Sequence, residues 1–537
     1  MEKKDFPCKT YVSRRQFLEG AGVLALAGVA GLAGCKAVVT QTSSNPPVTV
    51  TVTAPSTTVV STLTATKAAT TAATTSPATT AVPINANAVN WPMDIIGTFV
   101  ATPAKAAIGD TVTASGTGFK ALTSYDLMWQ DVTGVWNMVN GEFHGRSFTE
   151  NYIKLATIST DVQGAFSLTF QVPDGFGFTH DLVVLDNGVI RNKLGFPVLM
   201  QVSITPASGV LGTPITINVK GMGWQDYQNG WHVHYDNHEV GDITTTTTHG
   251  TGKAVIPATG AVGKHLIRVI EGGYTVAYQN HEECPFPDTP TFNIEYNLVD
   301  GVPVMPLPYI AQQLPNLNGV APAPTGKPQI WTDIVRAPVG TPFKISGMGF
   351  QPNTSIDLNY WVTTGNRVSG GGFALVKTPF GSVTTDANGA FEFKTVYPDT
   401  IGGDRLLEAD IADTTLAQTT FTIAPSIIDM QPMSGPVGTV AHFIVKGLSW
   451  TVTAKDCYIC YDDSKIGYAC AMTSKGTINV FLPMTGTPGW HYIDFWPGIY
   501  KGTDPASIEQ YRNPLLALAD HPGEVAAAFH FAFQITG

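Results

Sequence analysis

The strongest constraint on this chain is an internal duplication. Residues 206–274 align without a gap against residues 432–500, at a constant offset of 226 positions. Two further segments share the opening pattern: Gly with Thr or Asp, a strand-like run, then a glycine turn before an aromatic residue. Such self-similarity predicts tandem copies of one supersecondary unit. The four copies are IGDTVTASGTGF (108–119), LGTPITINVKGMGW (211–224), VGTPFKISGMGF (339–350) and VGTVAHFIVKGLSW (437–450).

The four copies are of two types. The first and third continue into TDVQGAF (160–166) and TDANGAF (385–391), whereas the second and fourth align with each other. We therefore expect a duplicated two-domain unit, joined by a Pro-rich linker at 299–329, with few contacts across that linker. The Asp and Gly of the TDxxG segments predict hairpin turns, because further carboxylates for a calcium loop are missing.

Composition and periodicity predict an all-β class. Charged residues make up 13% of the chain, against about a quarter in an average protein, while Gly and Pro number 54 and 37. Strand-like runs alternate with turns roughly every 8–12 residues, which is typical of a Greek-key sandwich. The predicted domains are four repeats of this kind, at 96–200, 201–298, 330–424 and 425–537.

Three motifs of the second and fourth repeats carry a family resemblance. They are a strand that begins Gly-Thr and reads G-T-x-[VI]-x-[VI] in the second repeat, Tyr-Asp-[Asn/Asp] with a later Gly, and a Pro followed by a Gly-x-His segment. Together they resemble bacterial immunoglobulin-like repeats of the IPT/TIG kind, which implies an immunoglobulin-like fold and a cell-surface setting but no particular ligand. His265 and His491 recur at one position of the motif, so we expect both to be structural hydrogen-bonding residues.

The N-terminus carries two motifs similar to export signals. SRRQFL (13–18), with Arg14 and Arg15, resembles a twin-arginine signal, and LAGC (32–35) resembles a lipoprotein processing box with Cys35 as the lipidated residue. Residues 1–35 are therefore interpreted as a signal peptide. The resemblance implies a bacterial envelope protein exported by the twin-arginine route and lipid-anchored at the outer face of the cytoplasmic membrane. An uncleaved N-terminal anchor is the alternative.

Residues 36–95 are rich in Thr, Ala and Pro and predict a disordered stalk, because sequence of this kind cannot bury a core. The formal net charge is −11, and no basic cluster is present. An acidic chain of this kind argues against a nucleic-acid partner. The expected partners are the membrane, through the N-terminal lipid, and a protein or glycan at the cell surface.

A histidine-rich strand, WHVHYDNHEVG (231–241), is the candidate metal site. Alternation places Trp231, Val233 and Tyr235 on the core face, so His232 and His234 point away from the core. Two such histidines could share zinc or copper with a third ligand, for which His249 or Glu239 is available. The matching strand CYICYDDSKIG (457–467) lacks these histidines, so the alternative is a solvated face or one packed on a neighbouring repeat. No other cofactor is expected.

Repeat one contains an insertion, residues 129–152, that departs from the repeat pattern. Its aromatic residues are candidates for stacking on a sugar or binding a protein partner, because binding residues are often found in loops and insertions. Filling of the core is the alternative use. The residues are Trp129, Trp136, Phe143 and Tyr152.

Three cysteines lie close together in the fourth repeat. A turn centred on Asp463-Ser464 would set Cys457 opposite Cys470, at a separation that permits a disulfide, and would leave Cys460 unpaired. The alternative is that these cysteines are small buried hydrophobic residues.

Familiar catalytic motifs were not found: the sequence has no Gly-x-Ser-x-Gly elbow, His-Glu-x-x-His pair or phosphate loop. We therefore predict a non-enzymatic, lipid-anchored extracytoplasmic repeat protein with an adhesion, envelope-structural or binding-surface role. The alternatives are a metal- or cofactor-binding accessory protein of an envelope redox enzyme, and a polysaccharide-binding protein.

Overall fold

The structure is a computed structural model. Arg14, Arg15, Cys35 and most of the predicted stalk lie outside the residues that it describes. In the described part of the chain, no helix is long and apolar enough to cross a membrane. The described residues are 84–85, 91–139, 141–225, 228–271, 277, 290–305, 309–311, 317–366, 372–412, 414–451, 453–473, 475–499, 513–522 and 528–537.

The described chain is all-β, as predicted, and forms four two-sheet sandwiches with one 3₁₀ turn, η4 (Leu518–Asp520). Each sandwich packs a three-stranded sheet against a larger sheet. In each larger sheet, a short early strand pairs in parallel with a late strand, while the other pairings of the core strands are antiparallel. This strand order defines immunoglobulin-like sandwiches.

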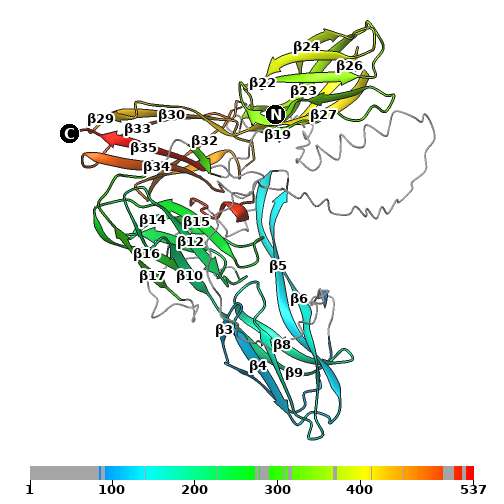
Figure 1. Ribbon diagram of the computed structural model, residues 1–537, viewed down its shortest axis with the longest axis vertical. Helices are drawn as coiled ribbons and strands as arrows, with labels where there is room; N and C mark the ends of the chain where they lie inside the picture. Colours follow the sequence, from blue (N-terminus) through cyan, green and yellow to red (C-terminus); the bar gives the residue numbers. More distant parts are fainter. Residues whose placement is uncertain are drawn as a thin grey trace, which may run out of the picture. The chain divides into compact units, whose positions relative to one another are not determined.

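In the first sandwich, the smaller sheet contains β2 (Thr98–Thr102), β4 (Thr111–Thr117) and β7 (Phe166–Gln171). The hairpin of β5 (Ser124–Val139) and β6 (Glu142–Ser159) runs as a long two-stranded ribbon (Figure 1). The predicted boundary at residue 95 lies too late, because β1 (Ile84–Asn85) already pairs with β6. The larger sheet has the order β1 (Ile84–Asn85), β6 (Glu142–Ser159), β5 (Ser124–Val139), β8 (Phe178–Asp186), β9 (Val189–Leu199) and β3 (Ala106–Ala107).

In the second sandwich, the smaller sheet contains β10 (Gln201–Thr205), β12 (Pro214–Lys220) and β15 (Gly252–Pro257). Alternation along β12 buries Ile215, Ile217 and Val219 completely, because successive side chains of a strand point to opposite faces. The larger sheet has the order β11 (Ser208–Gly209), β17 (Phe292–Leu298), β16 (Gly263–Glu271), β13 (Trp231–Tyr235) and β14 (His238–Ile243).

In the third sandwich, the smaller sheet contains β20 (Gln329–Thr332), β22 (Pro342–Met348) and β25 (Phe391–Val396). Its core contains Phe343, Leu358 and Phe421. The larger sheet has the order β19 (Leu317–Asn318), β21 (Ile334–Pro338), β27 (Thr414–Ala424), β26 (Gly403–Ile411), β23 (Ser355–Asn366) and β24 (Gly372–Thr384).

In the fourth sandwich, the smaller sheet contains β28 (Ser426–Gln431), β30 (Val440–Lys446) and β33 (Ile478–Pro483). The short strand β29 (Ser434–Gly435) pairs with β35 (Ala528–Ile535). β18 (Tyr309–Ala311) also pairs with β35 and so belongs to this sandwich, although it lies within the predicted linker at 299–329. The larger sheet has the order β18 (Tyr309–Ala311), β35 (Ala528–Ile535), β34 (Gly489–Pro497), β31 (Asp456–Tyr461) and β32 (Ser464–Cys470).

The repeated glycines explain why the sequence pattern recurs. In every sandwich, a glycine with positive φ precedes the middle strand of the smaller sheet (β4, β12, β22 or β30) and another follows it, a conformation that other residues rarely adopt. The pattern therefore marks the two backbone turns that begin and end this strand. In chain order the glycines and their φ values are Gly109 (84°), Gly118 (75°), Gly212 (79°), Gly221 (73°), Gly340 (81°), Gly349 (77°), Gly438 (88°) and Gly447 (78°).

The second and fourth sandwiches share a buried junction, so the expectation of few contacts across the linker is wrong. Trp496 and Cys460 of the fourth sandwich lie in the same apolar cluster as Trp231 and Val233 of the second. The Cys460 thiol donates to the Val240 carbonyl over 3.3 Å. The two sandwiches therefore bury apolar and polar groups against each other, which separate domains on a linker would not do.

Asp520, in the loop between β34 and β35, ties the fourth sandwich to the first two. Its buried carboxylate accepts bonds from the Thr246 and Thr247 amides, at 2.7 and 2.5 Å, and from the Thr247 hydroxyl at 2.8 Å. Its backbone carbonyl accepts a 2.6 Å bond from the Trp136 indole. One residue thus links three sandwiches.

Candidate metal centre

The β13–β14 hairpin places four ionisable side chains on one face. Its two-residue turn, Asp236-Asn237, has positive φ at both positions, and the register pairs His232 with Asp242 and His234 with Glu239. Because a bulge follows Val233, both pairs fall on the same face of the hairpin. The opposite face carries Trp231, Val233 and Tyr235 into the core, as alternation predicts.

This polar face is buried by the fourth sandwich. His232 is 0% exposed and Asp242 1% exposed, because residues 513–516 run along the edge of β14. The Asp242 amide donates to the Pro514 carbonyl, and the Leu516 amide donates back to the Asp242 carbonyl, both at 2.8 Å. The face that carries His232 and His234 is therefore not solvated; it packs on a neighbouring repeat, which was one of the alternatives to a metal site.

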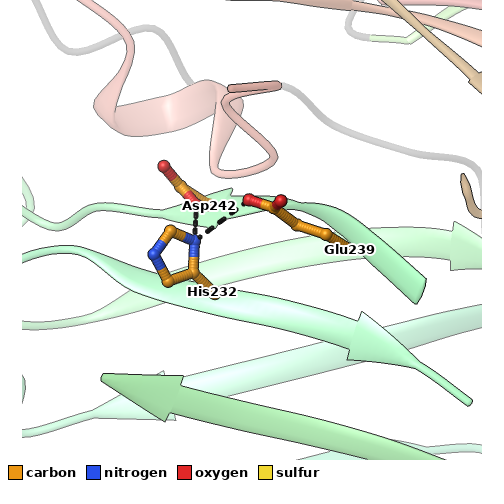
Figure 2. A group of neighbouring side chains, drawn as sticks. All are labelled: His232, Glu239 and Asp242. Atoms are coloured by element: carbon orange, nitrogen blue, oxygen red, sulfur yellow. Dashed lines mark ion pairs between the residues drawn. The ribbon is translucent and has the colours of Figure 1, made fainter. Parts of the chain in front are cut away.

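His232, Glu239 and Asp242 converge around one point. His232 Nδ1 lies 2.5 Å from Asp242 Oδ1 and 3.3 Å from Glu239 Oε1. Figure 2 shows this nitrogen facing both carboxylates. One ligand atom from each residue lies within 4.8 Å of the others, so together they form a candidate cation site of one imidazole and two carboxylates.

Two residues of the fourth sandwich hold these carboxylates in place. Lys465 Nζ lies 3.2 Å from Glu239 Oε2 and also donates to the Asn513 side-chain oxygen. The Asn513 amide nitrogen lies 3.3 and 3.2 Å from the two Asp242 oxygens. Glu239 Oε1 is left facing His232, because Lys465 occupies the other oxygen.

The electrostatics of the cluster follow from its burial. Burial alone lowers the pKa of His232, but the negative charges of Asp242 and Glu239 overcome it and raise that pKa to about 10. Burial also lowers the pKa of His234, and the neighbouring His232 lowers it further. Although burial raises the pKa of Glu239, its contacts with His232 and Lys465 lower it overall.

The predicted ligand set of His232, His234 and His249 is not brought together. His249 is exposed, with φ of 50°, and its ring lies 6.1 Å from that of Phe176. Glu239, the other candidate for the third ligand, does contact His232. Asp242 was not among the ligands predicted from the sequence. Regular pairing from the turn would set Asp242 opposite Trp231 on the core face, and only the bulge aligns Asp242 with His232, so strand alternation gave no signal for this ligand.

The insertion aromatics pack inside the protein and not on a free surface. Trp129 is 2% exposed in the first core and stacks on His180, with ring centroids 4.9 Å apart. Phe143 is 0% exposed against Ile499 and Leu515, with Trp136 packed beside it. Tyr152 is half-buried, and its hydroxyl donates to Asp181. Packing, the alternative use, therefore accounts for these residues.

The expected Cys457–Cys470 bridge is not formed. The turn is Asp462-Asp463, one residue earlier than expected, and a bulge after Ile459 pairs Cys457 with Ala469 and Cys470 with Asp456. Positive φ at both turn positions explains the shift, because Asp tolerates this conformation better than Ser does. Cys457 is a free, buried thiol, in line with the alternative of a small hydrophobic residue.

The recurring histidines are structural, as predicted. His265 Nδ1 contacts Asp236, and His491 Nδ1 lies 2.5 Å from Asp462, so each ring braces the turn of its own hairpin. The other ring nitrogen bonds a backbone carbonyl four residues earlier, at 2.7 Å for His265 and 2.9 Å for His491. The same hydrogen-bonding arrangement thus recurs in both copies.

The sequence matches no family model and no curated protein. Among solved structures, the chain is similar to Salmonella alpha-2-macroglobulin reacted with methylamine, at 9% identity and a TM-score of 0.18, covering 82% of this chain and 31% of that one. It is similar to the D0-D1 domain of intimin at 14% identity and a TM-score of 0.13, covering 33% and 91% of the two chains. It is also similar to the ICAM-5 D1-D4 ectodomain fragment, at 7% identity and a TM-score of 0.16, covering 82% of this chain and 100% of that one.

Because these TM-scores are low, the class of protein is defined by the strand order of its sheets. The chain is an immunoglobulin-like repeat protein with four sandwiches in its described part.

Proposed function

We propose that this chain is a lipid-anchored extracytoplasmic protein whose sandwiches form a rigid scaffold at the cell surface, with an adhesion or envelope-structural role. The observation that carries the proposal is the Asp520 contact set, which joins three sandwiches through buried bonds. A scaffold needs sandwiches that keep fixed positions, and buried charge-assisted bonds provide them. The twin-arginine motif and Cys35 supply the route and the attachment.

The proposal is tested in cells of the native host. Labelled fatty acid should enter the wild-type protein, and protease added to intact cells or spheroplasts should digest it. Cys35→Ala should lose the label, and Arg14→Lys with Arg15→Lys should keep the protein inside. A matched control, Lys9→Arg, changes a basic residue outside the motif and should behave as the wild type. If the double substitution leaves export unchanged, the protein does not use the twin-arginine route. If the wild-type protein takes up no labelled fatty acid, it is not anchored by a lipid.

A second candidate, an accessory protein that carries a metal in the envelope, is favoured by one observation. His232, Glu239 and Asp242 converge in a buried site. Elemental analysis of protein purified from its native host tests this role: a stoichiometric metal favours it, and protein free of metal argues against it. The polysaccharide-binding alternative has no comparable support, because Trp129 and Phe143 are buried.

A further inference from the structure

We propose that His232, Glu239 and Asp242 bind one divalent transition-metal ion, for which zinc is the best fit. Zinc bonds imidazole nitrogen and carboxylate oxygen at about 2.0–2.2 Å, so its tetrahedral ligand atoms lie roughly 3.4 Å apart. His232 Nδ1 already lies 3.3 Å from Glu239 Oε1 and 2.5 Å from Asp242 Oδ1. Small rotations of these side chains would therefore complete the site shown in Figure 2.

The duplicated repeat provides an internal control for this assignment. At the positions of His232, Glu239 and Asp242, the fourth sandwich has Tyr458, Lys465 and Tyr468. That sandwich forms the same hairpin, with the same bulge, from residues that cannot supply this ligand set. The fold of the hairpin does not need the three ligands, so their convergence in one copy calls for a separate role.

Burial and hydrogen bonding point to a ligand at the same place. His232 is 0% exposed, and neither of its ring nitrogens has a partner in hydrogen-bond geometry, despite the short approach to Asp242. Glu239 Oε1 is also buried without a hydrogen bond. Buried polar atoms are normally satisfied, and those left unsatisfied in a native structure need an explanation. A zinc ion would replace the proton on His232 Nδ1, which is released to solvent, and would satisfy His232 Nδ1 and Glu239 Oε1 together.

Partners behind the ligands orient them, as is usual around protein-bound metals. Lys465 forms an ion pair with Glu239 Oε2, so that Oε1 is available to the ion, and the Asn513 amide donates to the carboxylate of Asp242. Both partners belong to the fourth sandwich. The ion would consequently strengthen the junction between the second and fourth sandwiches, and this consequence is independent of lipid attachment.

Zinc loading of the full-length protein tests the site. Chelator-treated protein is incubated with zinc sulfate, freed of excess ion and analysed for metal content. One zinc ion per chain is expected for the wild type, and a background content for His232→Gln and Asp242→Asn. The matched control is Asp494→Asn, which alters another buried His–Asp pair, at 2.7 Å from His530, and should retain full zinc content. Asn513→Leu should weaken zinc binding on the order of 10–100-fold.

A second measurement keeps the proposal testable if a variant fails to fold. X-ray absorption of the zinc-loaded wild type should show imidazole nitrogen and carboxylate oxygen as ligands, with no sulfur. A zinc–sulfur shell would place the ion on cysteines and overturn the proposal. Failure of the wild type to retain zinc, or full retention by folded His232→Gln, would also overturn it. None of these results bears on attachment through Cys35, so the two proposals fail separately.

Discussion

Glu239 and Lys465 occupy equivalent positions of the duplicated sandwiches and form an ion pair with each other, with 3.2 Å between Glu239 Oε2 and Lys465 Nζ. The strands that carry the pair, β14 and β32, are both sheet edges and contact each other. The two sandwiches thus contact each other through equivalent edge strands.

A double-mutant cycle should detect this ion pair. Glu239→Gln and Lys465→Met, made singly and together in the full chain, should give a coupling energy of about 1 kcal/mol in urea unfolding, because the pair is only partly exposed. The exposed pair Lys264–Glu295 is the control, and its coupling should be near zero. Equal coupling in both cycles would mean that the junction does not bury the Glu239–Lys465 pair.

Removal of the Asp520 carboxylate should loosen three sandwiches together. Asp520→Ala leaves the buried Thr246 and Thr247 amides without an acceptor, so we expect a loss of roughly 2–4 kcal/mol in the free energy of unfolding. Hydrogen exchange should rise at both amides. Asp386→Ala is the control: it also removes an acceptor from two backbone amides, but water can replace the exposed carboxylate, so its effect should be much smaller. If Asp520→Ala and Asp386→Ala lower the free energy of unfolding equally, the Asp520 carboxylate does not link the sandwiches through buried bonds.

The repeat pattern was sufficient to predict the fold, because it marks features that every sandwich needs. Gly212 and Gly438 mark the same backbone turn, and Trp231 and Tyr235 alternate into the core as expected. The two TDxxG segments are also turns: Asp161 and Asp386 each accept bonds from two backbone amides of their own loop.

The candidate site was predicted only in part, because it depends on features that a local pattern does not carry. A bulge aligns Asp242 with His232, and only the register of the hairpin reveals it. Asn513 reaches the site from a residue 271 positions away in the sequence. In the fourth sandwich, a turn one residue earlier than expected moved Cys457 out of register with Cys470, and the bulge after Ile459 restores only one of the two positions. Sequence alternation gives the face of a strand but not its partners.

The His491–Asp462 pair should make stability depend on pH. The bond to Asp462 raises the pKa of His491 in the folded protein, so the pair contributes fully below the unfolded-state value of about 6.5 and is lost as pH rises through the raised folded-state value. Asp462→Asn should therefore cost more stability at pH 5.5 than at pH 9. Urea unfolding at several pH values measures this. In the His491→Gln background the pH dependence of the effect should vanish; if it persists, another group is responsible.

Cys457 and Cys460 should be slow to react in the folded protein. Burial raises the pKa of both thiols, which leaves little thiolate, and neither side chain is accessible to reagent. Iodoacetamide should label them only after unfolding, and peptide mapping without reduction should find Cys457 unbridged. A Cys457–Cys470 bridge in protein exported by its native host would show that the hairpin register is wrong.

Cleavage between the duplicated halves tests most directly whether they form one interlocked structure. A protease site inserted between Gly301 and Val302, where Val302 is 88% exposed, separates the first two sandwiches from the last two and leaves β18 with the fourth. After cleavage of the full chain, the two pieces should co-elute in size-exclusion chromatography at the volume of the uncut protein. Their separation into two independently folded species would contradict the buried junction of the second and fourth sandwiches.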